Sequence, residues 1–229
     1  MAQRPVFVPE RSGYPFVKKI DVEFKWFPGM VKSQTQKSIR SLHEAAEKAG
    51  YKSLLEISSK SEDSLGVSLS AFNLNITNDS KKMSVECAFQ GSKVFEHGGP
   101  YHDLYYSSSL DAKRDDRIRT SGNIIGFDFM GIQFPTMPIT LFYDWLYIMA
   151  LHQNRKLSDQ ILAYDGFTDI AFNPQKSWNC QARSAALYKA LHETGQLEQV
   201  ISDKACYTSL FTNPTKPLTG GAQMGFGFI

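Results

Sequence analysis

The chain has 229 residues, enough for one large domain or two small ones with a buried core. Hydrophobic residues make up 42% and charged residues 21%, the balance of an ordinary globular protein, and a net charge of +2 excludes nucleic-acid binding through bulk positive charge. Three widely spaced cysteines without a C-x-x-C pair support neither a zinc site nor a disulfide framework.

The first residues lack the apolar stretch of a secretory signal, and the longest apolar run, 139–151, is too short to cross a bilayer and contains Asp144. We therefore expect a cytoplasmic protein with no membrane partner. One local group of cations is available to an anionic partner, although the same residues suit a solvated surface. It consists of Lys32, Lys37 and Arg40 with Arg11, Lys18 and Lys19.

The N-terminal third predicts a strand followed by a helix. Residues 1–15 contain three prolines and are expected to be irregular. Apolar positions 22, 24 and 26 alternate with charged ones, which predicts a half-buried strand that ends at the Pro-Gly pair 28–29. Ser33 and Gln36 have the spacing of a capping box, and apolar positions 39, 42 and 46 predict a helix that Gly50 ends.

The middle of the chain mixes both kinds of element. Residues 54–57 and 67–74 are expected to be short strands, and 83–96 a helix that the Gly-Gly-Pro run 98–100 stops. The charged stretch 111–121 is expected to be an exposed helix end or loop.

The last third predicts an apolar helix at 139–152, a short helix at 158–164 and a strand at 167–172. Asn179 is expected to cap a last helix that ends at Gly195, and the tail 220–229 to pack as an arm. No repeat or linker divides the chain. We expect one α+β domain over 1–229, predominantly helical with a few short strands.

The segment 84–95 carries the clearest chemistry. On a helix, Glu86, Gln90 and Lys93 share one stripe with His97. A carboxylate and an amine presented together can work as an acid/base pair or as a base and a nucleophile, and burial would lower the pKa of the lysine. The same spacing also fits a surface ion pair of little consequence, so spacing alone leaves both interpretations open.

Three motifs in order resemble the NADAR (YbiA-like) family. Residues 85–95 (VECAFQGSKVF) resemble its V-E-H-x-F-Q-x-x-K-F core, and residues 69–74 (LSAFNL) resemble its L-S-N-F-Y-P segment. The pair Asp144 and Trp145 matches its D-W pair at the start of a helix. This motif core spans about 55–190, which leaves the strand and helix at 15–50 as an extension.

The chain is more closely similar to the NADAR antitoxins encoded beside a DarT-type DNA ADP-ribosyltransferase toxin. The stretches that carry this likeness extend it to nearly the whole chain, and they are 33–39, 55–61, 141–147, 167–174 and 179–182. The resemblance implies an N-glycosidase that removes ADP-ribose from guanine in single-stranded DNA, without a metal or cofactor. It also implies ADP-ribose as the product and a DarT-type toxin as the functional partner.

The resemblance places the catalytic glutamate and lysine of the family at Glu86 and Lys93. Asp144 is the third catalytic candidate, because a carboxylate inside an apolar helix needs a partner and could hold ribose hydroxyls or move a proton. Cys87 stands where the family has histidine, and Ala71 where it has asparagine; the C-terminal W-G motif is missing. The candidate substrate-binding residues are Phe72, Asn73, Gln90, Trp145, Asp169, Asn179, Ser33 and Lys37.

Candidates for the diphosphate are Lys37 and Arg40 on the first helix, or Ser33 and Lys32 at its start, since no Walker or G-x-G-x-x-G loop is present. Three other functions remain open. The chain could hydrolyse a phosphorylated ribosylamine of riboflavin synthesis, bind ADP-ribose without catalysis, or block a toxin by direct contact.

Overall fold

The computed structural model describes residues 1–29, 31–78 and 81–212. These residues form two compact units, each made of two separate stretches of chain: Met1–Ser70 with Arg155–Val200, and Ala71–Asn154 with the described residues from 201 to 212. Helix outweighs strand in the described part, which confirms the expected α+β class. The predicted arm at 220–229 lies outside the described residues, and a single domain over 1–229 stays a prediction.

The first unit contains a four-stranded sheet in the order β2-β1-β9-β3. β1 is antiparallel to both of its neighbours, and β3 is parallel to β9, so segments far apart in the sequence lie side by side. The strands are β1 (Ala2–Pro9), β2 (Val17–Phe24), β3 (Leu54–Glu56) and β9 (Gly166–Thr168). The strands predicted near 22, 54 and 167 are therefore present.

The expectation that residues 1–15 are irregular is wrong for Ala2–Pro9, which form the strand β1, and holds for residues 10–15. The prolines of β1 cannot donate a backbone hydrogen bond, and in a sheet such residues are tolerated at edges. β9 pairs only with Val6 and Phe7, so Pro5 and Pro9 lie where β2 is the only neighbour in the sheet.

The predicted first helix is confirmed as α1 (Lys32–Lys48). Its buried residues pack with Val22 and Phe24 of β2, and they are Ile39, Leu42 and Ala46. The prediction of a capping box is wrong. The helix begins one residue before Ser33, and no side-chain hydrogen bond caps it at its N-cap, Val31. Gly50 follows the helix with φ +94, a backbone conformation that favours glycine.

The strand predicted at 67–74 is also wrong. Residues Ser64–Ser68 form helix α2, because the carboxylate of Asp63 accepts a hydrogen bond from the Leu65 backbone N–H at 2.8 Å and caps the turn. Gly66 of α2 packs tightly, since a Cβ there would lie 1.9 Å from the backbone oxygen of Glu56.

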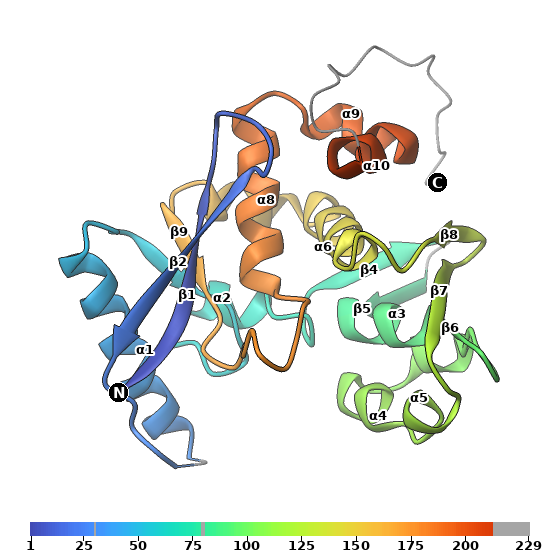
Figure 1. The fold of residues 1–229 in the computed structure, drawn as a ribbon, viewed down its shortest axis with the longest axis horizontal. Helices are drawn as coiled ribbons and strands as arrows, with labels where there is room; N and C mark the ends of the chain where they lie inside the picture. The colour runs from blue at the N-terminus through green and yellow to red at the C-terminus, as the bar shows by residue number, and fades with distance from the viewer. Residues whose placement is uncertain (30, 79–80, 213–229) are drawn as a thin grey trace. The chain divides into compact units, whose positions relative to one another are not determined.

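The other helices of the first unit are α7 (Arg155–Ile161) and α8 (Gln181–Glu193), and α9 (Leu197–Ser202) begins in this unit and ends in the second. α8 lies against β1 and β2 (Figure 1). The N-cap of α8 is Cys180, which makes no side-chain cap bond, so the prediction that Asn179 caps this helix is wrong. α8 is also not the last helix, because α9 and α10 (Lys204–Thr212) follow it.

The second unit contains the hairpin β4-β5 and an antiparallel sheet in the order β6-β7-β8. Its strands are β4 (Asn75–Asn78), β5 (Lys81–Ser84), β6 (Lys93–Phe95), β7 (Ile124–Phe129) and β8 (Ile132–Phe134). Its helices before α10 are α3 (Val85–Gly91), η1 (His102–Tyr106), α4 (Ser109–Arg114), α5 (Arg117–Thr120) and α6 (Leu141–Gln153).

α6 is the predicted apolar helix, and it is buried from Leu141 to Leu151. Phe142 stacks on Phe127 of β7 with ring centroids 4.7 Å apart, and the Trp145 ring lies 5.0 Å from that of Phe134. This aromatic cluster forms much of the core of the unit. In the part of the chain that the structure describes, no helix is both long and apolar enough to span a membrane.

The helix predicted over 83–96 is too long. α3 ends at Gly91, and Lys93 begins strand β6, where it pairs with Phe127. Glycine is a poor helix former, and the Ser92 hydroxyl donates to the Ala88 carbonyl at 2.6 Å, which closes the last turn. His97, predicted at the helix end, lies beyond β6 and is exposed.

Candidate functional site

A chain of hydrogen bonds joins the three residues that the motif singles out. The Lys93 amine donates to Gln90 Oε1 at 2.6 Å, and Gln90 Nε2 donates to Glu86 Oε1 at 2.9 Å. Glu86 and Gln90 meet because they are one helical turn apart on α3. Lys93 reaches Gln90 from the first position of β6, not from the same helix face as predicted. Gln90 therefore bridges the amine and the carboxylate.

All three residues are buried: as whole residues, Glu86 and Gln90 are 7% exposed and Lys93 is 8% exposed. The surface ion pair that spacing left open is thus excluded. Burial lowers the pKa of Lys93 from 10.5 to about 8; the carboxylate of Glu86 opposes this change, and the charge of Lys113 adds to it. A substantial fraction of the Lys93 amine is therefore neutral near physiological pH, and a neutral amine is a nucleophile.

The ring of Phe89 lies under the amine, with Lys93 Nζ 4.7 Å from its centroid. This ring is held by the aromatic core, since its centroid lies 5.2 Å from that of Tyr143 and 5.7 Å from that of Phe127. Gly99 packs closely against the backbone of Lys93. A Cβ at position 99 would lie only 2.3 Å from the Lys93 carbonyl oxygen, so only glycine fits there. The Gly-Gly-Pro run thus packs on the site and does not end a helix.

The carboxylate is positioned by the start of α3. Ser84 caps the helix by accepting from the Cys87 N–H at 3.1 Å. The Glu86 N–H donates to the Ala71 carbonyl at 2.9 Å, which fastens the helix to the segment that resembles the second family motif. Cys87, which replaces the family histidine, is buried and its thiol donates to the Ser107 carbonyl.

Lys113 of α4 also belongs to this site, and the sequence analysis did not identify it. Its Nζ lies 3.9 Å from Glu86 Oε1 and 5.2 Å from the ring centroid of Phe72. The charged run 111–121 has no motif that ties it to α3, so only the tertiary fold brings Lys113 here. Phe72, a predicted binding residue, is half-buried, and the neighbouring Asn73 is exposed.

The two predicted residues on α6 are deeply buried. Asp144 is 1% exposed and lies in the first turn of the helix. Trp145 is 4% exposed and packs its ring against Phe129, Phe134 and Phe142. The ring of Trp145 is thus part of the aromatic core, and its role as a pocket wall stays a prediction, as does the catalytic role of Asp144.

Asp169 belongs to the first unit and takes part in a buried carboxyl pair there. Its Oδ1 accepts from the N–H groups of Ala171 at 3.0 Å and Phe172 at 3.2 Å. Burial, and then the nearby charge of Glu56, raise the pKa of Asp169 to about 7, and burial also raises the pKa of Glu56. The pair therefore holds at least part of a proton at neutral pH.

Glu56 is held by a short polar network. The Thr168 hydroxyl donates to one of its carboxyl oxygens at 2.6 Å, and the Ile170 N–H donates to the other at 2.9 Å. Since that hydroxyl proton is used, the His43 Nε2, 2.8 Å from the Thr168 oxygen, is the donor to it. Burial lowers the pKa of His43 to about 4, which keeps the ring neutral. A cavity of about 290 Å³ is lined by residues that include His43 and Glu56.

The remaining predicted residues also lie in the first unit. Ser33 and Lys37 are exposed on α1, and the Oδ1 of Asn179 is buried without a hydrogen-bond partner. Their binding roles stay predictions. Several cations of the predicted anion-binding group are engaged in ion pairs, which reduces the charge available to a ligand. These pairs are Arg40 with Glu62, Arg11 with Glu193, and Lys19 with Asp21.

A second cavity, of about 650 Å³, lies beside β7 and β8 and is lined by residues that include Phe127, Phe134 and Lys204. Glu86, Gln90 and Lys93 are not among its lining residues. Among the described residues, no group of three or more His, Cys, Asp or Glu side chains is arranged to hold a metal ion.

Comparison with known families assigns the chain. The model of the DarT1-associated NADAR antitoxin matches residues 2–218, which is nearly the whole sequence. The chain therefore belongs to the DarT1-associated NADAR antitoxin family. A comparison with curated proteins found no match.

Proposed function

We propose that the protein hydrolyses the N-glycosidic bond between ADP-ribose and a guanine base of single-stranded DNA, and that it thereby acts as the antitoxin of a DarT-type toxin. The observation that carries this proposal is the buried chain from Lys93 through Gln90 to Glu86. Membership of an antitoxin family associated with DarT1 supports the partner. The lowered pKa of Lys93 supports nucleophilic attack, because it raises the fraction of the amine that is neutral.

Cleavage of a ribosyl–nitrogen bond develops positive charge on the sugar and negative charge on the base. In the proposed first step, the Lys93 amine forms a C–N bond to the anomeric carbon while the bond to guanine breaks. The bonding electron pair leaves with the guanine nitrogen. The attacking nitrogen then carries an excess proton, which the carboxylate of Glu86 accepts and passes to the departing base.

The second step releases the sugar. Opening of the ribose ring converts the adduct into a Schiff base between Lys93 and the former anomeric carbon. Addition of one water molecule cleaves this C=N bond and returns the free amine and ADP-ribose. In this scheme Gln90 keeps the amine and the carboxylate from forming a direct ion pair, which would hold the amine protonated.

The test is release of ADP-ribose from a single-stranded oligonucleotide that carries ADP-ribosylated guanine. We expect turnover by the wild type and a loss of at least about 100-fold in Lys93→Ala and in Glu86→Gln, because both act in the bond-breaking step. Arg114→Gln, an exposed cation next to Lys113, is the matched control and should retain activity. Full activity of Lys93→Ala would exclude both the covalent scheme and a general-base role for this residue.

Borohydride added during turnover tests the covalent step. Reduction should trap one ADP-ribosyl group on Lys93, and absence of this adduct would contradict the Schiff base.

Three other outcomes would favour the alternative functions. Hydrolysis of a phosphorylated ribosylamine of riboflavin synthesis in place of the oligonucleotide would change the proposed substrate but keep the class of N-glycosidase. Tight ADP-ribose binding without turnover, unchanged in Lys93→Ala, would replace catalysis by a binding function, and toxin inhibition without DNA repair would indicate direct blocking.

A further inference from the structure

The position of α4 relative to α3 is set by a run of hydrogen bonds. The Cys87 N–H donates to the Ser84 hydroxyl at 3.1 Å, and the Ser84 and Ser109 oxygens are 2.7 Å apart. The Ser109 hydroxyl donates to the Phe72 carbonyl at 2.9 Å, so the proton between the two serines comes from Ser84. These bonds fasten the first residue of α4 to the N-cap of α3, the helix that carries Glu86.

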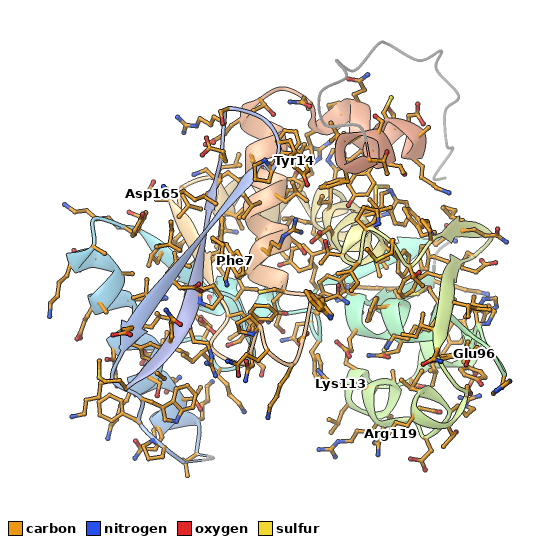
Figure 2. All side chains as sticks on the ribbon, in the orientation of Figure 1. Phe7, Tyr14, Glu96, Lys113, Arg119 and Asp165 are labelled. Carbon is orange, nitrogen blue, oxygen red and sulfur yellow. The ribbon has the colours of Figure 1, made fainter. Side chains whose placement is uncertain are left out.

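Lys113 follows Ser109 by four residues and therefore lies on the same face of α4. This face places its Nζ 3.9 Å from Glu86 Oε1, the oxygen that also accepts from Gln90, and over the Phe72 ring. The two partners differ greatly in exposure, since the side chain of Lys113 is 56% exposed and that of Glu86 only 9%. A solvated cation thus stands at the outer side of a buried carboxylate (Figure 2 labels Lys113 on α4).

We propose that Lys113 is a positioning residue, which pairs with the buried carboxylate of Glu86 from the solvent side and adds a repelling positive charge near the Lys93 amine. The proposal rests on the proposed function, in which Glu86 accepts a proton and Lys93 attacks as a free amine. Lys113 itself touches neither the bond that breaks nor the amine, and it acts through charge.

The elements around Lys93 carry several charged or titratable side chains: Glu86 on α3, Asp111, Lys113 and Arg114 on α4, Asp128 on β7, and Asp144 and His152 on α6. Glu86 and Lys113 are the two whose charges act on the pKa of Lys93, and they act in opposite directions. A carboxylate close to an amine favours the ammonium form, and a second cation disfavours it. Lys113 therefore offsets the effect of Glu86 without removing the carboxylate that the reaction needs.

The first experiment titrates Lys93 directly in the full chain without substrate, by NMR of isotope-labelled lysine side chains. The Lys93 signal is assigned by its loss in Lys93→Met. In Lys113→Gln we expect the titration midpoint of Lys93 to move to higher pH, because a repelling charge is gone. Lys113→Arg should keep the wild-type midpoint, and so should Arg114→Gln, whose side chain starts one residue further around the helix.

Salt provides a second readout. Because Lys113 is half-exposed, its effect should weaken as salt rises from about 0.05 to 0.5 M, so the midpoints of the wild type and Lys113→Gln should converge. In the glycosidase assay, Lys113→Gln should be roughly threefold slower at pH values below the midpoint and regain wild-type turnover well above it. A general folding defect would lower turnover at every pH.

An unchanged Lys93 midpoint in Lys113→Gln would overturn the proposal, as would a shift of the same size in Arg114→Gln. The outcome is separate from that of the proposed function, because the titration requires no substrate. If the oligonucleotide is not cleaved but the midpoint moves as expected, the electrostatic role stands and the reaction is wrong.

Discussion

The side-chain nitrogen of Lys93 lies over the ring of Phe89, 4.7 Å from the centroid. An aromatic face stabilises a cation, so this contact favours the ammonium form of Lys93. The pKa of Lys93 is nevertheless lowered to about 8, because burial outweighs the attraction of the Glu86 carboxylate. The reactivity of this amine is therefore a balance of opposed contributions, and each can be changed by a single substitution.

Replacement of Phe89 by leucine removes one of these contributions. In the proposed reaction the rising limb of the pH–rate profile follows the pKa of Lys93, which is about 8, and we expect it to move to lower pH in the variant, because the neutral amine gains relative to the cation. The free energy of unfolding should fall by about 1–2 kcal/mol, since the ring packs on Phe127, Phe142 and Tyr143. A profile displaced to higher pH would contradict this account; urea unfolding measures the stability.

Lys93→Met should make the protein more stable at pH 7. The pKa of Lys93 is about 8 in the folded chain and 10.5 when unfolded, so the unfolded state binds more protons between these values and stability rises with pH there. Below pH 8 the wild type carries the full cost of the buried amine. The free energy of unfolding, obtained from thermal melts, should be about 1–3 kcal/mol higher for the variant at pH 7, and this difference should shrink as pH approaches 10.5. A variant less stable at pH 7 would show that Lys93 serves packing.

Asp169→Asn should change how the stability of the chain depends on pH. The pKa of Asp169 is raised from 3.8 to about 7, so its stabilising contribution is complete below pH 3.8 and is lost as pH rises through 7. Asparagine keeps an oxygen for the N–H groups of Ala171 and Phe172 and carries no charge. The free energy of unfolding from melts at pH 8 should be about 1–3 kcal/mol higher for the variant, and melts at or below pH 3.8, where the contribution of the carboxyl is complete, should nearly coincide. Equal differences at both pH values would exclude a protonated carboxyl.

Gly66→Ala should destabilise the first unit strongly. A Cβ at this position would lie 1.9 Å from the Glu56 carbonyl oxygen, and neither backbone can yield without moving α2 or β3. We expect a loss of at least about 3 kcal/mol in the free energy of unfolding, measured with urea. Gly50→Ala is the control: nothing lies within 4 Å of its Cβ, so only the positive φ should cost about 1 kcal/mol.

The elements that could be predicted from the sequence are those with a complete local pattern. α6 is apolar through three turns, and α1 has its buried residues at helical spacing, so both were expected at nearly their observed bounds. β1 and β6 could not be predicted, because each depends on a distant partner. The prolines of β1 are untypical of a strand, and β1 forms because it pairs with β2 and β9. The residues of β6 continue the helical pattern of α3 in the sequence, but they pair with β7 in the structure.

The candidate site was predictable in part for the same reason. The spacing of Glu86 and Gln90 on α3 determines their contact, and the family motif adds Lys93. Lys93 joins them by a different route than expected, since the chain turns after Gly91 and enters a strand. Lys113 has no local signal, because its place beside Glu86 follows from the Ser84–Ser109 contact between two helices.

Each unit is made of two stretches that alternate along the sequence, and this order has a consequence for protein synthesis and for truncation. β9 occupies the middle of its sheet, between β1 and β3, but it is made more than a hundred residues after either of them. Until Gly166–Thr168 has left the ribosome, β3 has no neighbour in that sheet, whereas the stretch that carries Glu86, Lys93 and Lys113 is already complete. A fragment that stops at Asn154 would therefore keep the amine and the carboxylate and leave its first seventy residues with a hairpin and an unpaired strand.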